Sequence, residues 1–142
     1  MRFWMSLFII FMLSGCDNQS TKDAILQVDV FREMYNNNNF FDIYSSSALG
    51  LKKAMTEQQL VSFLGKQKED LGKFKSATLL NSTVINNSEV TLSFQTNYNK
   101  DSFLELFVYK KEPNGYKLFY YTIDTQRTLK IDPVTHAIQL PK

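Results

Sequence analysis

The chain has 142 residues, with 16 lysines and arginines against 14 aspartates and glutamates, for a formal net charge of +2 at neutral pH. This length is enough for one compact domain with its own core. Because no basic cluster exceeds Lys52-Lys53 or Lys110-Lys111, the composition gives no support for nucleic-acid binding, which depends on neutralising phosphates.

The first 16 residues have the layout of a secretion signal. Arg2 supplies a positive charge, and residues 3–13 are almost entirely apolar. This run is shorter than the roughly 20 residues that a membrane-spanning helix needs. The small residues Ser14 and Gly15 then precede Cys16, the only cysteine of the chain, and such small side chains are typical of a signal-peptidase site.

The stretch Leu13-Ser14-Gly15-Cys16 resembles the lipobox of bacterial lipoproteins, in which the cysteine sulfur receives a diacylglycerol and the mature chain begins at that cysteine. The resemblance implies that Cys16 is the lipid-attachment site, with acyl chains such as palmitate, and that residues 1–15 are a signal peptide. It also implies anchoring in the bacterial cell membrane on its periplasmic face. The following Asp17 favours the inner membrane under enteric sorting rules, and the choice between inner and outer membrane stays open. An ordinary cleaved signal is the alternative.

Cleavage would leave 127 of the 142 residues, with 15 basic and 14 acidic side chains. If Cys16 is acylated, no disulfide can form, and the core must hold the fold without one. The polar residues at 16–22 predict a short tether. Residues 23–127 then form the predicted α+β domain, and residues 128–142 an edge segment or tail.

Helical periodicity dominates the first half of this domain. Ser20 followed by Asp23 predicts a helix start, and apolar residues recur at helical spacing until residues 36–39, four asparagines, end the helix. Residues 40–55 predict a second helical stretch, broken near residues 45–47 and Gly50.

A third helix begins at Thr56, where Thr56 and Gln59 have the spacing of a capping box, and Gly72 is placed to end it. The predicted buried face of this helix contains Leu60, Phe63, Leu64, Gln67 and Leu71.

From residue 73 the pattern changes to the alternation that is typical of strands. The predicted strands run over residues 74–85, from residue 89 to about 95, over 102–112 and over 116–125. Pro113-Asn114-Gly115 predicts a tight turn between the last two, because proline presets φ and glycine accepts a positive φ.

That turn predicts a register. With Glu112 opposite Tyr116, the facing pairs are Tyr109–Phe119, Phe107–Tyr121 and Glu105–Ile123. One sheet face is then strongly apolar and should form the core beneath the helices, with Val90, Leu92, Phe94, Phe103, Phe107, Tyr109, Phe119, Tyr121 and Ile123. The opposite face is also fairly apolar, so we expect something to cover it, such as a partner subunit. This face contains Leu104, Leu106, Val108, Leu118 and Tyr120.

Glu105 breaks the pattern of the aromatic face. A carboxylate there would be costly unless it is paired. The functional hypothesis makes Glu105 a pocket acid or ligand anchor, with Tyr109 or Tyr121 nearby. The alternatives are a register slip by one residue, an ion pair with Arg32, or a position at the open end of the sheet.

Three helical segments followed by a four-stranded meander resemble the nuclear transport factor 2-like (cystatin-like) superfamily, in which a curved sheet wraps helices into a cone with a pocket. The segments at 34–44, 51–60 and 71–72 are similar to small uncharacterised bacterial lipoproteins of that type, although asparagines stand where those proteins have a Gly-Asp pair. The resemblance implies a fold and a pocket but no reaction, because the superfamily hosts enzymes, binders and scaffolds.

The sequence contains no recognisable catalytic constellation. The only histidine is His136, so no histidine-based triad or metal cluster can be built, and the five glycines form no phosphate loop. We therefore expect no metal and no cofactor. The favoured hypothesis is a non-catalytic envelope lipoprotein that binds a protein partner, a second copy through the sheet, or a small ligand; a toxin-neutralising immunity lipoprotein is one version. The alternative is a cone-pocket enzyme that uses Glu105 and tyrosines for acid–base chemistry.

Overall fold

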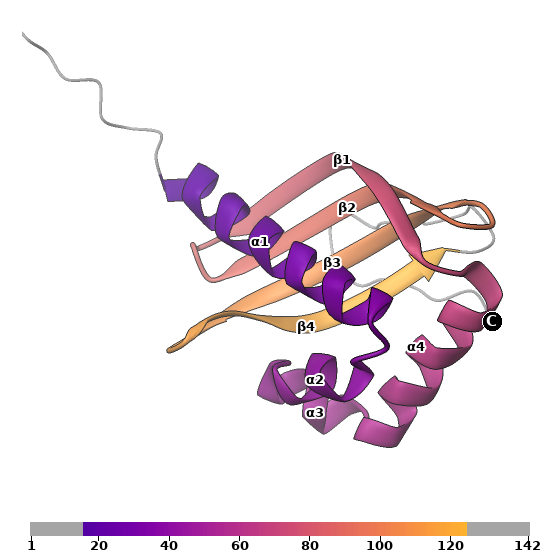
Figure 1. Cartoon of the computed structure of the whole chain (residues 1–142). Helices are drawn as coiled ribbons and strands as arrows, with labels where there is room; N and C mark the ends of the chain where they lie inside the picture. The colour runs from indigo at the N-terminus through magenta and orange to yellow at the C-terminus, as the bar shows by residue number, and fades with distance from the viewer. Residues whose placement is uncertain (1–15, 125–142) are drawn as a thin grey trace, which may run out of the picture.

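The computed structural model describes residues 16–124 (Figure 1). The predicted signal peptide at residues 1–15, the predicted segment at 128–142 and His136 lie outside the described residues. The helices are α1 (Cys16–Asn36), α2 (Phe40–Ser45), α3 (Leu49–Ala54) and α4 (Glu57–Leu71). The strands are β1 (Phe74–Ile85), β2 (Glu89–Tyr98), β3 (Ser102–Glu112) and β4 (Gly115–Asp124).

The fold has two layers, as the sequence predicts: the helices precede and cover a four-stranded antiparallel sheet. The strands follow one another in the order β1-β2-β3-β4, so the sheet is an open meander with β1 and β4 at its edges. α1 lies across one face of the sheet, against β1, β2 and β4, while α2 packs on α4 and α3 contacts β4 (Figure 1). Within residues 16–124, no helix combines the length and the apolar character needed to cross a membrane.

α1 begins earlier than the sequence predicts, at Cys16 instead of Ser20. Ser20 is buried on the same face as Ala24 and Val28, so the packed face extends one turn further toward the N-terminus. The residues that we expected to form a tether are therefore helical. The helix ends among the asparagines as predicted, where Asn38 takes a positive φ of 61°.

The stretch that we predicted as one broken helix forms two short helices, α2 and α3. The break lies at residues 46–48, as the serines suggest, but Gly50 lies inside α3 and not at the break. A Cβ added at Gly50 would meet Cε2 of Phe119 at 2.2 Å, so this glycine allows α3 to approach β4 closely.

α4 begins with the predicted capping box. The backbone N–H of Gln59 donates to Oγ1 of Thr56 at 3.2 Å, and the Thr56 N–H donates to Oε1 of Gln59 at 2.8 Å. Gly72 ends the helix with a φ of 82°. The prediction that Phe63 is buried is wrong, because its side chain is 43% exposed at the margin of the packed face. Its ring still meets the edge of Tyr121, with centroids 6.3 Å apart.

The predicted register of the β3–β4 hairpin is wrong near the turn and correct beyond it. Glu112 faces Gly115 instead of Tyr116, so Tyr109 pairs with Leu118 and not with Phe119. An irregularity on β4 then adds one residue, which restores the predicted pairs Phe107–Tyr121 and Glu105–Ile123.

This irregularity changes which side chains of β4 enter the core. Leu118, predicted on the opposite face, is buried in the core together with Tyr116, whereas Phe119 is only half-buried. The other predicted positions on β2 and β3 are buried in the core, where the ring of Phe31 on α1 meets Phe107 edge-on at 5.2 Å.

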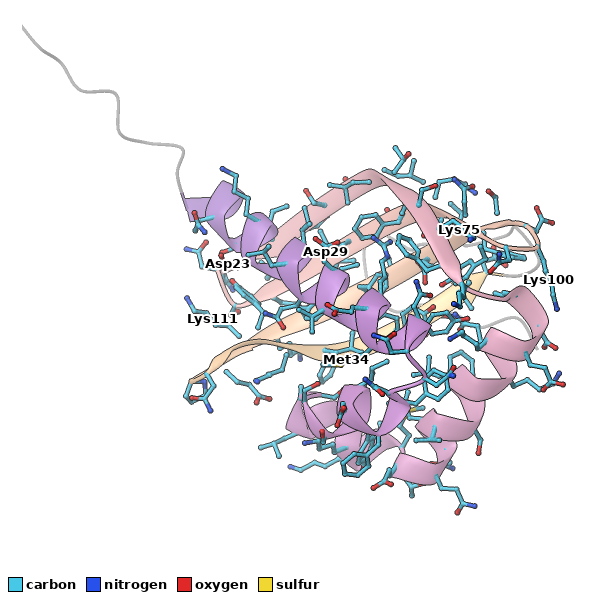
Figure 2. The ribbon with its side chains drawn as sticks, viewed as in Figure 1. Asp23, Asp29, Met34, Lys75, Lys100 and Lys111 are labelled. Carbon is cyan, nitrogen blue, oxygen red and sulfur yellow. The ribbon has the colours of Figure 1, made fainter. Side chains whose placement is uncertain are left out.

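The sheet face away from the helices is mixed in its exposure. Leu106 is buried there, while Leu104, Val108 and Tyr120 are half-buried. Lys75, Lys100 and Lys111 are exposed at the margins of the domain (Figure 2).

Candidate functional site

Glu105 lies at the centre of the most polar part of the core. It is on β3, its side chain faces α1, and its exposed fraction is 0%. The sequence alternation therefore placed it correctly on the aromatic face, and the alternatives of a slipped register or an open sheet end do not hold.

Four donors surround the Glu105 carboxylate. Oε1 accepts a hydrogen bond from Thr96 Oγ1 at 2.6 Å and lies 3.4 Å from Nη2 of Arg32. Oε2 accepts from the hydroxyls of Tyr98 and Tyr121, both at 2.6 Å. A carboxylate offers about four acceptor positions, so these donors use its full capacity and suit its ionised form. We call Glu105, Arg32, Thr96, Tyr98 and Tyr121 the Glu105 network.

Strand geometry explains how β2 and β4 supply three of these donors. Glu105 faces Phe94 on β2 and Ile123 on β4. Because side chains on one face recur every second residue, Thr96 on β2 and Tyr121 on β4 are diagonal neighbours of Glu105. Tyr98 lies two residues further along β2 and reaches back with its long side chain.

Arg32 closes the network from α1. Its guanidinium carbon lies 4.4 Å from the ring centroids of both Phe74 and Phe94, so two aromatic faces contact the cation. The side chain is buried, and its Nε has no hydrogen-bond partner among the described residues. Of the alternatives that the sequence left open, the ion pair between Arg32 and Glu105 is the one that the structure contains.

The two tyrosines of the network are donors and not bases. Burial, followed by the charge of Glu105, raises the pKa of Tyr98 well above its ordinary value of 10.0, and the same two causes raise the pKa of Tyr121. Both hydroxyls therefore stay protonated at neutral pH, and each directs its single hydrogen to Oε2 of Glu105.

Gln67 on α4 donates to both tyrosines of this network. Its amide nitrogen Nε2 donates to the Tyr121 hydroxyl at 2.8 Å and to the Tyr98 hydroxyl at 3.3 Å. The sequence predicts that Gln67 is buried, from its place on the α4 stripe, but not that it contacts these tyrosines.

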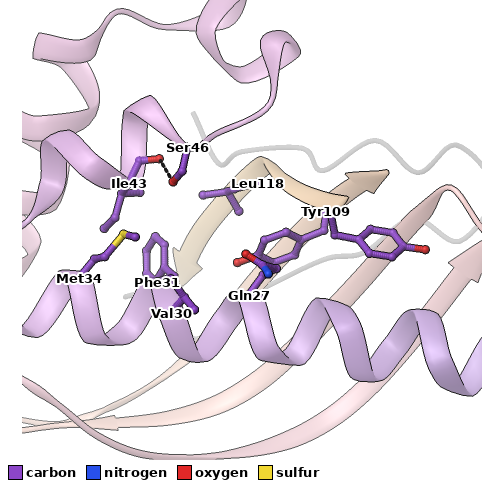
Figure 3. A pocket seen from close by; sticks show the side chains of 9 residues that line it. Gln27, Val30, Phe31, Met34, Ile43, Ser46, Tyr109 and Leu118 are labelled. Carbon is purple, nitrogen blue, oxygen red and sulfur yellow. Dashed lines mark hydrogen bonds between the residues drawn. The ribbon is translucent and has the colours of Figure 1, made fainter. Parts of the chain in front are cut away.

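Of the two tyrosines that we predicted near Glu105, Tyr121 belongs to the network and Tyr109 lies apart from it. Tyr109 is buried, which raises its pKa, and no hydrogen bond within residues 16–124 joins it to Glu105. Instead it lines a small cavity of about 30 Å³ beneath α1, together with Phe31 and Leu118 (Figure 3). This volume accommodates about one water molecule.

A larger cavity of about 380 Å³ opens between α4 and the end of β4. Its lining residues are Ser62, Phe63, Lys66, Gln67, Asp70, Leu71 and Ile123. Glu105 does not line either cavity, but Gln67 is shared by the larger cavity and the hydrogen-bonded chain that leads to Glu105.

In the described part of the chain, no three histidine, cysteine, aspartate or glutamate side chains come close enough together to hold a metal ion. Comparison with protein-family models and with curated proteins found no match.

Proposed function

We propose that this protein is a bacterial lipoprotein, anchored at the cell envelope through lipid on Cys16, whose α+β domain is a non-catalytic binding module. The observation that carries the anchor is the ordered series of positive charge, short apolar run, small pair and single cysteine within residues 1–16. Each buried methylene contributes ~0.8 kcal/mol, so two or three acyl chains give stable anchoring where one does not.

The start of α1 supports a domain held close to the bilayer. The helix begins at Cys16, and Ser20 is buried against the domain. Four residues of helix span ~6 Å, so a packed residue lies about one turn from the proposed lipid. Membership of the nuclear transport factor 2-like superfamily, which we also propose, is supported by the helices packed on one face of the four-stranded meander.

All acceptor positions of the Glu105 carboxylate are occupied by internal donors, and this favours a binding module over an enzyme. A general acid or base must reach a proton on the substrate. Glu105 has an exposed fraction of 0%, lines neither of the two cavities described above and has four internal donors. It therefore acts as an internal structural anion, and the two tyrosine donors remain neutral.

An exposed sheet edge supports the binding of another chain. Among residues 16–124, β1 pairs only with β2, and most of its residues are exposed, with Leu79 at 39% and Leu80 at 55%. An edge strand of this kind presents unpaired backbone groups to a strand of a partner. Between Lys75 and Glu89 the chain has no charged side chain to oppose such pairing.

The anchor is tested by labelling cells with an alkyne analogue of palmitate and separating membranes from soluble protein. We expect the wild-type chain and Ser14→Ala, which keeps a small residue before the cysteine, to be labelled and membrane-bound. Cys16→Ala should lose both the label and the membrane association. A labelled or membrane-bound Cys16→Ala protein would show that the lipobox assignment is wrong.

The binding module is tested by placing a photo-crosslinking amino acid at Leu80 in intact cells. We expect one reproducible crosslinked product from Leu80, either with a partner protein or with a second copy, and none from a matched position at exposed Lys53. Equal crosslinking from both positions, or none from Leu80, would contradict a partner at the β1 edge.

A further inference from the structure

The cavity between α4 and the end of β4 has the size of a ligand site. Its volume of about 380 Å³ falls within the range of roughly 300–1,000 Å³ that small-molecule pockets occupy. Phe63, Leu71 and Ile123 give it apolar walls, and Gln67 is the polar residue that links it to the buried network.

The direction of the hydrogen bonds determines which way the Gln67 amide is turned. Each tyrosine hydroxyl has one hydrogen, and both hydrogens go to Oε2 of Glu105. Tyr98 and Tyr121 can therefore only accept from Gln67, so the amide nitrogen faces them. The charge on Glu105 thus fixes the amide orientation through two intervening hydroxyls.

The oxygen of this amide, Oε1, accepts no hydrogen bond within the described residues. Gln67 is only 6% exposed, and its Oε1 has no hydrogen-bond partner among residues 16–124. A buried carbonyl oxygen without a partner is rare in folded proteins, because it loses its bonds to water and gains none in return. Gln67 also lines the cavity. Its Oε1 has less than 1 Å² of accessible surface, so the cavity wall must shift slightly before a ligand can reach this oxygen.

The rim of the cavity indicates the charge of a ligand. Nζ of Lys66 lies 2.8 Å from Oδ1 of Asp70, and both residues line the cavity. These opposite charges neutralise each other, so the rim presents a polar but electrically balanced surface.

We propose that this cavity binds a small, uncharged and largely apolar molecule that donates one N–H or O–H hydrogen bond to Oε1 of Gln67. This inference rests on the proposed function of the domain as a binding module and adds the chemical class of its ligand. The apolar walls supply most of the contact area, and the amide oxygen selects for the donor.

Indole and 1-methylindole test the donor directly, because they share one ring system and only indole has an N–H. Both are titrated into the full-length ¹⁵N-labelled protein while the amide resonances of α4 and the Gln67 side chain are followed by NMR. We expect indole to bind about tenfold more tightly, the difference that one hydrogen bond to a buried acceptor makes. The Gln67 side-chain resonance should shift with indole and much less with 1-methylindole.

Three variants separate the site from general effects on folding. Gln67→Met should remove the preference for indole, whereas Gln27→Met, the same change at an exposed position beside the 30 Å³ cavity, should keep it. Ser62→Phe changes an exposed residue of the larger cavity and should weaken both compounds without touching the network. Amide spectra establish that each variant is folded.

Equal affinity for the two compounds, or a preference that survives in Gln67→Met, would overturn the proposal. Absence of binding by both compounds would overturn it too. That result would leave the anchor and the β1 edge intact as proposals, because labelling of Cys16 and crosslinking from Leu80 are measured independently of this cavity.

Discussion

Replacing Glu105 by glutamine should destabilise the domain strongly, although the two side chains have nearly the same shape. Glutamine keeps one carbonyl oxygen but places an NH₂ group where a carboxylate oxygen accepted hydrogen bonds. If the NH₂ group replaces Oε2, the hydroxyls of Tyr98 and Tyr121 meet a donor. If it replaces Oε1, the hydroxyl of Thr96 and the guanidinium of Arg32 do. Arg32 is left as a buried cation without its anion.

The magnitude follows from these contacts. A hydrogen bond to a charged group contributes about 1.5–3 kcal/mol, and breaking a buried ion pair from one side costs about 3–5 kcal/mol. The hydroxyl contacts to Glu105 are 2.6 Å long, while the contact to Arg32 is 3.4 Å. We therefore expect a loss of about 3–5 kcal/mol, most of it through the hydroxyls, from a domain whose total stability is about 5–15 kcal/mol.

Urea unfolding of the wild type, Glu105→Gln and the exposed control Glu69→Gln measures this loss. A double-mutant cycle with Arg32→Met then isolates the ion pair, for which we expect a coupling energy of about 0.5–3 kcal/mol. A loss below about 1 kcal/mol for Glu105→Gln, or a loss equal to that of Glu69→Gln, would refute the reasoning that Glu105 is a buried structural anion.

Three further outcomes are expected. The pKa of each of four tyrosines in or against the core is raised above 10.0, so the unfolded chain loses protons above about pH 10 while the folded chain keeps them. Stability should therefore be full below that pH and fall above it, by up to ~1.4 kcal/mol per pH unit for each tyrosine. Urea unfolding between about pH 8 and 11 measures this fall. These tyrosines are Tyr35, Tyr98, Tyr109 and Tyr121. Lys68→Met should lower the free energy of unfolding in urea by about 1–2 kcal/mol, because Nζ of Lys68 donates to the last two carbonyls of α1 at 2.9 and 2.7 Å. Lys66→Met, at an exposed position, should change this free energy little. In urea unfolding, Gly50→Ala should lower the free energy of unfolding by about 1–3 kcal/mol through the clash with Phe119. Gly65→Ala, whose Cβ would lie 3.9 Å from Phe40, should raise it by about 0.5–1 kcal/mol. A change of the same sign in both variants would contradict the role of Gly50.

Much of the fold follows from local patterns in the sequence. The capping box at Thr56 and the glycine at Gly72 mark the ends of α4, and the change of period at residue 73 marks the start of the sheet. Alternation along β3 was sufficient to turn Glu105 inward. The error near Phe119 has a definite cause: an extra residue within β4 leaves the alternation of the neighbouring segments intact and changes only their phase.

The donors around Glu105 were only partly predictable. Tyr121 follows from the register and Arg32 from its place on α1. Thr96 and Tyr98 carried a usable signal, because alternation from the inward Phe94 turns both toward the helices, but a threonine and a tyrosine on a strand suggest nothing by themselves. The contact of Lys68 with the end of α1 had no sequence signal, because its partners include two backbone carbonyls that any residue provides.

The buried position of Glu105 serves to define the strand register more than to add stability to the fold. A buried ion pair is often no more stabilising than apolar side chains of the same volume, but it is costly to break. The Glu105 network joins α1, β2, β3 and β4, and Gln67 adds α4. A one-residue slip of β2 or β4 against β3 would turn the hydroxyls of Tyr98 or Tyr121 to the other face and leave the carboxylate without those donors. Apolar residues on both faces of β3 would penalise such a slip only weakly, since either face can be buried. The carboxylate penalises it strongly, and for that reason a charged residue in the aromatic core can define the register that an apolar residue would leave ambiguous.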